Sequence, residues 1–401
     1  MNRLIDNKRF RLALLLGSLA ALGPLTIDMY LPSFPTIAND YGTNASLVQF
    51  SLTACLLGLG IGQLVIGPMS DVRGRRQPLI IFITLYFISS IACAFAPSIY
   101  VFIGARFMQG FSAAAGIVIS RAVVRDVYSG RELTKFFALL MLINNLAPIL
   151  APIAGGGILR FTKWNGVFIV LAAIGILLVI LVTSKLEETL PKEQRVPSNI
   201  GQTLRNFMSL IKDRQFAGYA LTQGFITAGI FAYVSGTPFV YQNIYGVSPQ
   251  VFSILFGMNG IGIMIGTQLV GRFADIVSEE RFLKIGLLMS SLASIALLIV
   301  VLFNGPLFAV VISIFFFVSS IGIISTSSFS LAMDSQGNMA GSAAALLGLL
   351  PFILGSISAP LVGVAGENTA VPMGVIIFSA STLALLSFYG LARKNQKSVS
   401  Y

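Results

Sequence analysis

Two ionisable side chains stand in apolar stretches of this sequence, where a charge is costly. Asp28 lies near the end of the first long apolar segment, in the run IDMYLP, and Arg106 lies inside another. A buried carboxyl group favours its neutral form, whereas a nearby cation favours the charged form. Because the chain has no histidine, Asp28 is the candidate for a group that takes up a proton on one side of a membrane and releases it on the other.

The composition is that of a membrane protein. Hydrophobic residues make up 56% and charged residues 10% of the 401 residues, whereas soluble domains are about 25% charged. Apolar runs long enough to cross a bilayer as helices recur along the chain, without the alternation of barrel strands. We predict an all-α polytopic membrane protein with twelve transmembrane helices in two six-helix bundles, near 12–33, 46–69, 78–96, 98–120, 136–159, 164–184, 215–241, 250–271, 282–303, 306–330, 340–363 and 370–392.

The basic residues indicate the orientation of these helices. All 26 Lys and Arg residues except Arg106, Arg160 and Lys163 fall in the termini or in loops that share one side of the membrane. By the positive-inside rule, both termini face the cytoplasm. The net charge of +11 is therefore explained by topology rather than by binding to nucleic acid. The first apolar run continues past Ala21, which argues against a cleaved signal peptide.

The longest polar stretch separates two halves of the chain. We predict an N-terminal six-helix bundle at 1–184, a cytoplasmic linker at 185–214 and a C-terminal six-helix bundle at 215–401. Four apolar residues at helical spacing predict an amphipathic helix in the linker, lying on the membrane surface, with a solvated turn as the alternative. These residues are Ile200, Leu204, Phe207 and Ile211.

Two short patterns recur at matching positions in the halves. The pattern G-x-x-x-x-G-x-x-x-D ends at Asp71 and again at Asp275. The pattern A-P-x-x-G ends at Gly155 and again at Gly363. They indicate a duplication of six helices, which is typical of transporters whose two bundles rock around a central site. A channel or a membrane enzyme is disfavoured.

The loop between the second and third predicted helices reads GPMSDVRGRR. It resembles the motif G-x-x-x-D-R-x-G-R-R of the major facilitator superfamily, with Val72 where that family prefers a basic residue. The resemblance implies the major facilitator fold. An aspartate here can cap a neighbouring helix or pair with an arginine, forming an intracellular latch that opens as the bundles rock. An ordinary charged loop is the alternative. The latch candidates are Gly67, Asp71, Arg73, Gly74, Arg75 and Arg76, with Asp275 as a weaker counterpart.

Two further motifs resemble the same superfamily. Arg106 begins the run RFMQG, similar to R-x-x-Q-G, and should face the bundle interior; snorkelling and backbone pairing are the alternatives. The run APIAGG resembles the antiporter motif G-P-x-x-G-G of drug exporters, with alanine replacing the first glycine. Proline and glycine at this density predict a kinked helix with a flat packing face, although ordinary membrane-helix usage is the alternative. The motif residues are Pro148, Ala151, Pro152, Gly155 and Gly156.

The first apolar segment carries the most specific resemblance. Its run IDMYLPSFP is similar to the bicyclomycin-resistance (Bcr/CflA) branch of the twelve-span drug:proton antiporters, and the combined motifs extend this resemblance over essentially the whole chain. The resemblance implies export of small antibiotics, such as bicyclomycin or amphenicols, in exchange for protons. Because that branch is polyspecific, the resemblance does not identify the substrate.

We assign proton coupling to Asp28 and Arg106, because the other acidic residues fall in loops, tails or near segment ends. We hypothesise that Asp28 is protonated in the outward-facing state and releases a single proton inward when substrate binds. A carboxyl group that simply reaches the outer water is the alternative. Substrate-pocket candidates are aromatic and amide side chains, any of which could instead serve helix packing: Tyr30, Gln63, Asn144, Asn145, Gln223, Tyr233 and Asn259.

Three alternative functions use the same kind of fold. They are export of a native metabolite such as a sugar, purine or amino acid, proton-coupled import, and membrane sensing without transport. A nucleotide-driven pump and a membrane hydrolase are disfavoured, because neither a phosphate-binding loop nor a catalytic constellation is present. We expect no enzyme activity, cofactor or metal. The expected partners are a small-molecule drug, protons and the lipid bilayer of a bacterial inner membrane, with the chain as a monomer.

Overall fold

The computed structural model describes residues 2–195, 200–334, 336 and 339–392. All regular elements among them are helical, which confirms the predicted all-α class. At some helical positions the backbone is described but the side chain is not. These positions are 2–11, 131, 134, 135, 138, 141, 144, 145, 200, 202–204 and 340.

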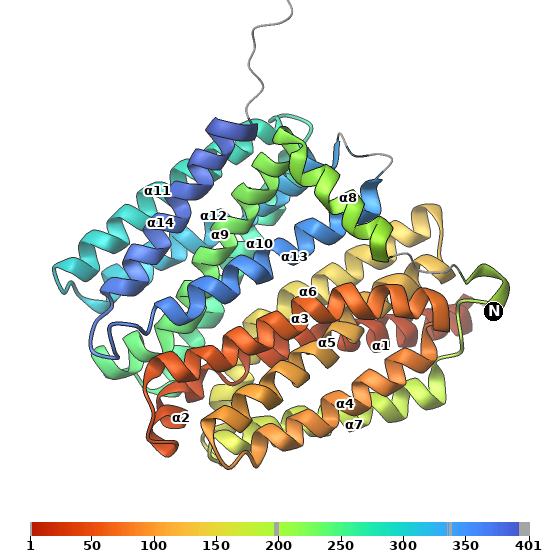
Figure 1. The fold of residues 1–401 in the computed structure, drawn as a ribbon, viewed down its shortest axis with the longest axis horizontal. Coiled ribbons are helices and arrows are strands. Elements are labelled where there is room, and N and C mark those ends of the chain that lie inside the picture. The colour runs from red at the N-terminus through yellow and green to blue at the C-terminus, as the bar shows by residue number, and fades with distance from the viewer. Residues whose placement is uncertain (1, 196–199, 335, 337–338, 393–401) are drawn as a thin grey trace, which may run out of the picture. The chain divides into compact units, whose positions relative to one another are not determined.

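The chain divides into two units. The first comprises Met1–Ser198 with Gly246–Gly257, and the second comprises Asn199–Tyr245 with Met258–Tyr401. The helices up to the end of the first half (Figure 1) are α1 (Asn2–Asp28), η1 (Leu31–Ser33), α2 (Phe34–Asp40), α3 (Ala45–Arg73), α4 (Arg76–Ala94), α5 (Ile99–Val127), α6 (Gly130–Ile158), α7 (Trp164–Lys185) and η2 (Lys192–Gln194).

The helices of the second half follow in chain order. They are α8 (Ile200–Lys212), α9 (Arg214–Phe239), η3 (Val240–Ile244), α10 (Pro249–Phe273), α11 (Glu279–Leu302), α12 (Leu307–Asp334), α13 (Ala340–Leu361), α14 (Val371–Ser387) and η5 (Phe388–Ala392).

These helices are long and apolar enough for a multi-pass membrane protein. Among the described residues, 11 helical segments could cross a membrane by length and composition. A shorter apolar stretch, Leu146–Ile158, lies within α6. Because α6 has 29 residues, it is about 43 Å long at the usual rise per residue. Each of the predicted membrane segments therefore coincides with a helix.

The same helix pairs pack together in both units. In the first unit α1 contacts α5 and α6, and α4 contacts α7; in the second unit α9 contacts α12 and α13, and α11 contacts α14. Each helix of the second set lies six membrane segments after its counterpart. This repeated set of contacts is what a duplication of six helices would produce.

Glycines allow close backbone approach at equivalent places in the two units. Gly62 on α3 lies against the backbone carbonyl of Phe111 on α5, and Gly266 on α10 lies against that of Ser319 on α12. A Cβ atom at either glycine would overlap the facing backbone. Small residues at membrane-helix interfaces let helices pack at short distance, so the recurring glycines of the sequence pattern have the same structural role in each half.

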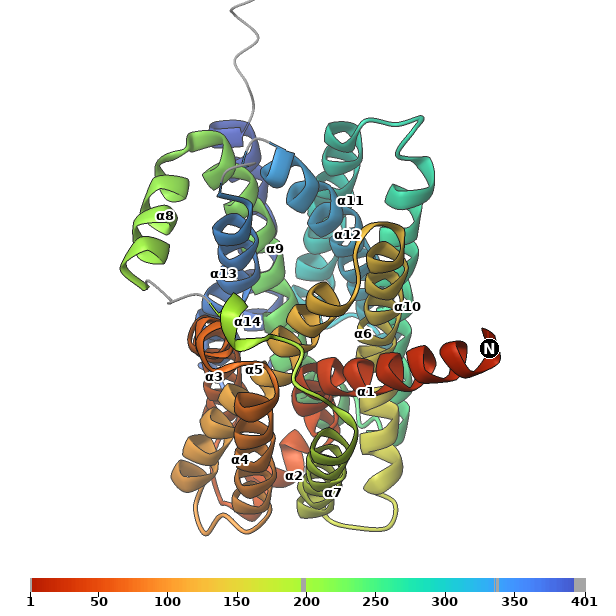
Figure 2. The ribbon, with the colours of Figure 1, turned by 90° about the vertical axis from the view of Figure 1, so that its right-hand side faces the viewer.

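The linker contains the predicted helix, α8, and its placement on the membrane surface stays a prediction. Phe207 and Leu210 are buried, whereas Ile211 is 55% exposed. The two buried side chains agree with the contacts that α8 makes with α13 and α9 of its own unit, as Figure 2 shows for α13. Asn206 supports this contact by donating a hydrogen bond from Nδ2 to Ser342 Oγ at 3.1 Å.

Candidate functional site

The first membrane segment is interrupted beside Asp28. It runs from Leu12 to Asp40 as one apolar helical stretch, but α1 ends at Asp28 and is followed by the short helix η1 and then α2. Pro32 and Pro35 stand at the second positions of these two helices, within the first turn, where proline's missing N–H is tolerated. Asp28 therefore lies at a helix break in the middle of the segment rather than at its end.

The Asp28 carboxyl group is buried, and no side chain that the structure describes pairs with it. The residue is 6% exposed, and it makes no hydrogen bond or ion pair with any residue whose side chain the structure describes. It is also the only buried aspartate or glutamate among those described residues. A carboxylate without a partner in an apolar setting is costly to keep charged, so the surroundings favour the protonated group.

Arg106 lies on α5 and is completely buried. Its Nη2 donates a hydrogen bond to the backbone carbonyl of Thr26 at 2.9 Å, and its Nη1 donates to Gln109 Oε1. Because α1 ends two residues after Thr26, that carbonyl belongs to the last turn, where backbone oxygens lack helical partners and attract cations. Arg106 is thus held by a helix end adjoining Asp28 and not by the carboxyl group itself.

The spacing R-x-x-Q places Gln109 one turn after Arg106 on the same helix face. Gln109 accepts from the arginine and donates from Nε2 to Ser90 Oγ of α4 at 2.8 Å. The buried cation is in this way connected to α4 as well as to α1. The motif therefore supplies both a charge and the amide that orients it.

Aromatic rings complete the surroundings of Arg106. The guanidinium carbon lies 4.1 Å from the ring centroid of Tyr30 and 5.5 Å from that of Phe168, within the range of cation–π attraction. Phe102 contacts both rings, with centroid distances of 6.5 and 5.3 Å. Tyr30, predicted as a substrate contact, is fully buried against Arg106, so its position suits support of the arginine.

The antiporter motif packs α6 against the helix break. Gly155 approaches the backbone carbonyl of Met29 so closely that a Cβ atom would overlap it. Ala151 is fully buried, and Pro148 and Pro152 lie inside a helix that continues to Ile158. The neighbouring Gly156 faces Ser253 of the first unit. Gly155 therefore lets α6 lie next to Met29, the residue that follows Asp28.

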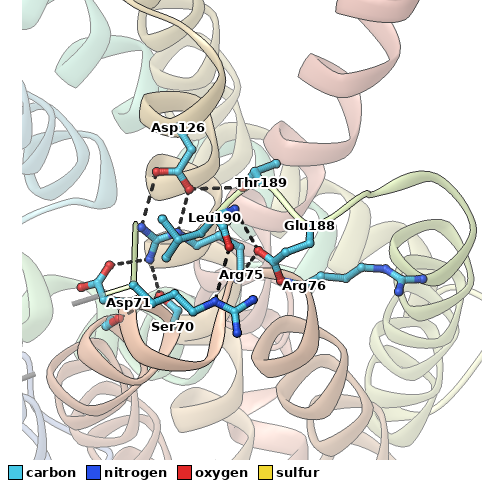
Figure 3. A network of polar contacts seen from close by, with 10 residues as sticks. Ser70, Asp71, Arg75, Arg76, Asp126, Glu188, Thr189 and Leu190 are labelled. Atoms are coloured by element: carbon cyan, nitrogen blue, oxygen red, sulfur yellow. Dashed lines mark hydrogen bonds and ion pairs between the residues drawn. The ribbon is translucent and has the colours of Figure 1, made fainter. Parts of the chain in front are cut away.

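A second polar site lies where α3 ends and α4 begins, and Figure 3 shows its side chains converging on Arg75. Arg75 Nη1 donates to Asp71 Oδ1 at 2.5 Å and to Ser70 Oγ at 2.9 Å. Its Nε donates to Asp126 Oδ2 at 2.8 Å. Asp71 thus pairs with an arginine of its own loop, one of the two arrangements considered from the sequence.

The carboxylate of Glu188 completes this network from the segment after α7. It accepts from the backbone N–H of Arg75 at 2.8 Å and of Arg76 at 3.2 Å. It therefore caps the start of α4, where a negative charge is favourable. Gly74 adopts a φ of +90°, and a side chain there would meet Glu188, so the loop needs glycine at this position.

The electrostatics of Arg75 follow from these contacts. Burial lowers the pKa of the Arg75 guanidinium, but hydrogen bonds and charges from Asp126 and Asp71 raise it more, so the pKa lies above its ordinary value. The group remains a cation. Asp126 and Glu188 were not among the predicted latch residues, because they lie far from the motif in sequence.

The remaining latch candidates do not enter the network equally. Arg76 contacts α7 through Nη2, which donates to the Thr183 carbonyl at 2.6 Å, and Gly67 contacts Val118. Arg73 is exposed. Asp275 in the second unit is also exposed and has no hydrogen bond or ion pair with the described residues, so no counterpart of the Arg75 network surrounds it.

The structure brings two of the predicted substrate contacts together. Asn259 is buried and donates from Nδ2 to the Tyr233 hydroxyl at 2.9 Å. Gln223 has a buried Oε1 without a partner among the described residues, and Gln63 is half-buried on α3. The side chains of Asn144 and Asn145 lie outside the described part of the structure. No group of three acidic or cysteine side chains that could hold a metal occurs among the described residues.

Comparison with known proteins identifies the family. Residues 16–360 match the model of the Major Facilitator Superfamily. The uncharacterized MFS-type transporter YdgK of Bacillus subtilis is 57% identical over 389 residues, covering 96% of each chain. A bicyclomycin resistance protein homolog of Haemophilus influenzae is 34% identical over 97% of this chain and 98% of that protein. A chloramphenicol resistance protein of Pseudomonas aeruginosa is 29% identical over 93% and 88%.

A solved structure shows the same fold. A bacterial homolog of the human lysosomal transporter Spinster superposes with a TM-score of 0.78 at 14% identity, covering 97% of this chain and 99% of that one. The resemblance to the bicyclomycin-resistance branch is confirmed by the Haemophilus relative. The chain therefore belongs to the Major Facilitator Superfamily and is a multi-pass membrane transporter rather than an enzyme.

Proposed function

We propose that this chain is a proton-coupled antiporter that exports small drugs resembling bicyclomycin or chloramphenicol by alternating access, with Asp28 as the proton carrier. Support for the drug class comes from the names of the relatives that match nearly the whole chain. The observation that carries the coupling mechanism is Asp28 itself, the only buried acidic side chain among the described residues. Both termini are placed in the cytoplasm, because the basic loops lie on one side.

The burial of Asp28 makes its charge responsive to a ligand. When the site is empty of substrate, the carboxyl group, which has no partner among the described side chains, favours the protonated form, since a buried carboxylate without a partner is costly. A drug that offers a positive charge or hydrogen-bond donors to Asp28 favours proton release. Drug and proton then exclude one another at this group, which is the requirement for antiport.

Arg106 and Gly155 serve the same site in different ways. Arg106 supplies a fixed positive charge bound to the α1 end through the Thr26 carbonyl, two residues before Asp28, without occupying that carboxyl group. Gly155 allows α6 to lie on the Met29 backbone. Movement of α6 is thereby transmitted to the helix break that carries Asp28.

The test is drug transport in proteoliposomes driven by an imposed pH gradient. Wild-type protein, Asp28→Asn and the control Asp275→Asn are compared with chloramphenicol and bicyclomycin. The control removes an exposed carboxylate that has no partner among the described residues. Gradient-driven transport by wild type and the control, with drug binding but no gradient-driven transport by Asp28→Asn, supports the proposal. Full coupling in Asp28→Asn refutes the role of Asp28, and wild type that moves neither drug refutes the substrate class.

A further inference from the structure

A cavity of about 810 Å³ opens beside the start of α4 in the first unit. Four basic side chains line it: Arg73, Arg76, Lys192 and Arg195. Among the described lining residues, the only carboxylate is that of Glu188. The cavity therefore gathers positive charge from two segments that are distant in sequence, the end of α3 with the start of α4 and the segment after α7.

The basic side chains have hydrogen-bonding capacity to spare. Arg73 and Lys192 make no hydrogen bond or ion pair with the described residues, and the Nε of Arg76 is buried without a partner there. Glu188 contributes one negative charge against four basic side chains, and its oxygens accept from the backbone N–H groups of Arg75, Arg76 and Leu190 at 2.8, 3.2 and 3.0 Å, so the described lining keeps a net positive charge. A buried donor and unpaired cations favour an anion with several acceptor oxygens.

One wall of the same cavity is apolar and is formed by residues of α4. Ile80 and Ile81 lie within the first two turns of α4, which begins at Arg76 and is long and apolar enough to span the bilayer. Ile81 is 48% exposed. Polar and apolar walls thus meet near the membrane boundary. A soluble anion would use only the polar wall, whereas a lipid would use both.

We propose that this cavity binds an anionic phospholipid, with its phosphate among Arg73, Arg76, Lys192 and Arg195 and an acyl chain along Ile81. Basic pockets at a membrane boundary bind such headgroups through charge and hydrogen bonds. The bound lipid connects the segment after α7 to the start of α4. It therefore reinforces the junction that Glu188 makes from the protein side. This assignment is independent of the transported substrate.

The test is native mass spectrometry of the purified full chain, delipidated and then titrated with phosphatidylglycerol. Phosphatidylcholine tests whether the negative headgroup matters, and inorganic phosphate tests whether the lipid chain matters. The pocket variant is Arg73→Gln with Lys192→Gln. The control is Arg272→Gln with Arg281→Gln. These two substitutions remove the same amount of positive charge from exposed positions in the second unit.

Wild type is expected to bind a first phosphatidylglycerol more tightly than phosphatidylcholine. Each basic side chain near an anionic lipid contributes about fivefold, so the pocket variant, which lacks two of them, should lose about 25-fold in affinity, and the control should change by less than about threefold. Lys192→Gln alone, on the exposed segment, should lose about fivefold and serves if the double variant unfolds. Equal losses in pocket and control variants, equal binding of the two lipids, or displacement of the lipid by inorganic phosphate would each overturn the proposal.

Discussion

Two carboxylates, those of Asp71 and Asp126, bind Arg75, and we expect their removal to lower the stability of the protein by different amounts. The Arg75 side chain is 6% exposed and pairs with both. The Asp126 side chain is 14% exposed, accepts from Nε at 2.8 Å, and also accepts from the Thr189 hydroxyl at 3.2 Å. The Asp71 side chain is 49% exposed and lies in the last turn of α3, four residues before Arg75. We therefore expect Asp126→Asn to destabilise the protein more than Asp71→Asn does.

The magnitudes follow from burial. Breaking a buried ion pair costs about 3–5 kcal/mol when a charge is left uncompensated. Since Arg75 keeps Asp71 as a partner in Asp126→Asn and the amide oxygen still accepts, we expect the smaller cost of a charged hydrogen bond, about 1.5–3 kcal/mol. Asp71→Asn weakens a pair that is half exposed to solvent, for which about 0.2–1 kcal/mol is typical.

The assay is unfolding of the purified full chain in mixed micelles, titrated with sodium dodecyl sulfate and followed by circular dichroism. Glu280→Gln is the matched control, because it removes a carboxylate that pairs with Lys284 at 2.7 Å while both side chains are more than two-fifths exposed. That control should cost no more than about 0.5 kcal/mol. If Asp71→Asn destabilises the protein as much as Asp126→Asn, the reasoning from burial is refuted.

Three further substitutions test the packing around the candidate sites. Gly155→Ala should destabilise by about 1–3 kcal/mol, because its Cβ overlaps the Met29 backbone, whereas Gly157→Ala, which has open space at its Cβ, should be nearly neutral in the same unfolding assay. Arg106→Lys keeps the charge but loses the planar fork, so thermal unfolding in detergent should show destabilisation of about 1–3 kcal/mol; an unchanged midpoint would contradict the described contacts. Tyr233→Phe removes a buried hydrogen-bond acceptor and should cost about 0.5–1.5 kcal/mol, and no loss in unfolding free energy would argue against that bond.

The sequence alone predicted the membrane fold well, because long apolar runs leave little choice but helices in a bilayer. It also identified Asp28 and Arg106, since charges in apolar segments are conspicuous. It could not predict what holds Arg106. The answer depends on the helix break after Asp28, which leaves the Thr26 carbonyl without a helical partner, and on the stacking of Tyr30.

The Arg75 network shows the same limit at the other site. The loop motif contains both Asp71 and Arg75, so their pairing across the end of α3 can be anticipated from the motif. Asp126 and Glu188 lie 51 and 113 residues from Arg75. Only the packing of α3, α5 and the segment after α7 brings them together. A single sequence contains no local pattern that marks such partners.

The most direct test of the central claim is proton release by the purified protein when drug is added. Wild type and Asp28→Asn are mixed with chloramphenicol or bicyclomycin in weakly buffered detergent solution containing a pH indicator. The account predicts that wild type releases up to a single proton per bound drug and that Asp28→Asn binds drug without releasing one. Equal proton release by both proteins would contradict the assignment of Asp28 as the proton carrier.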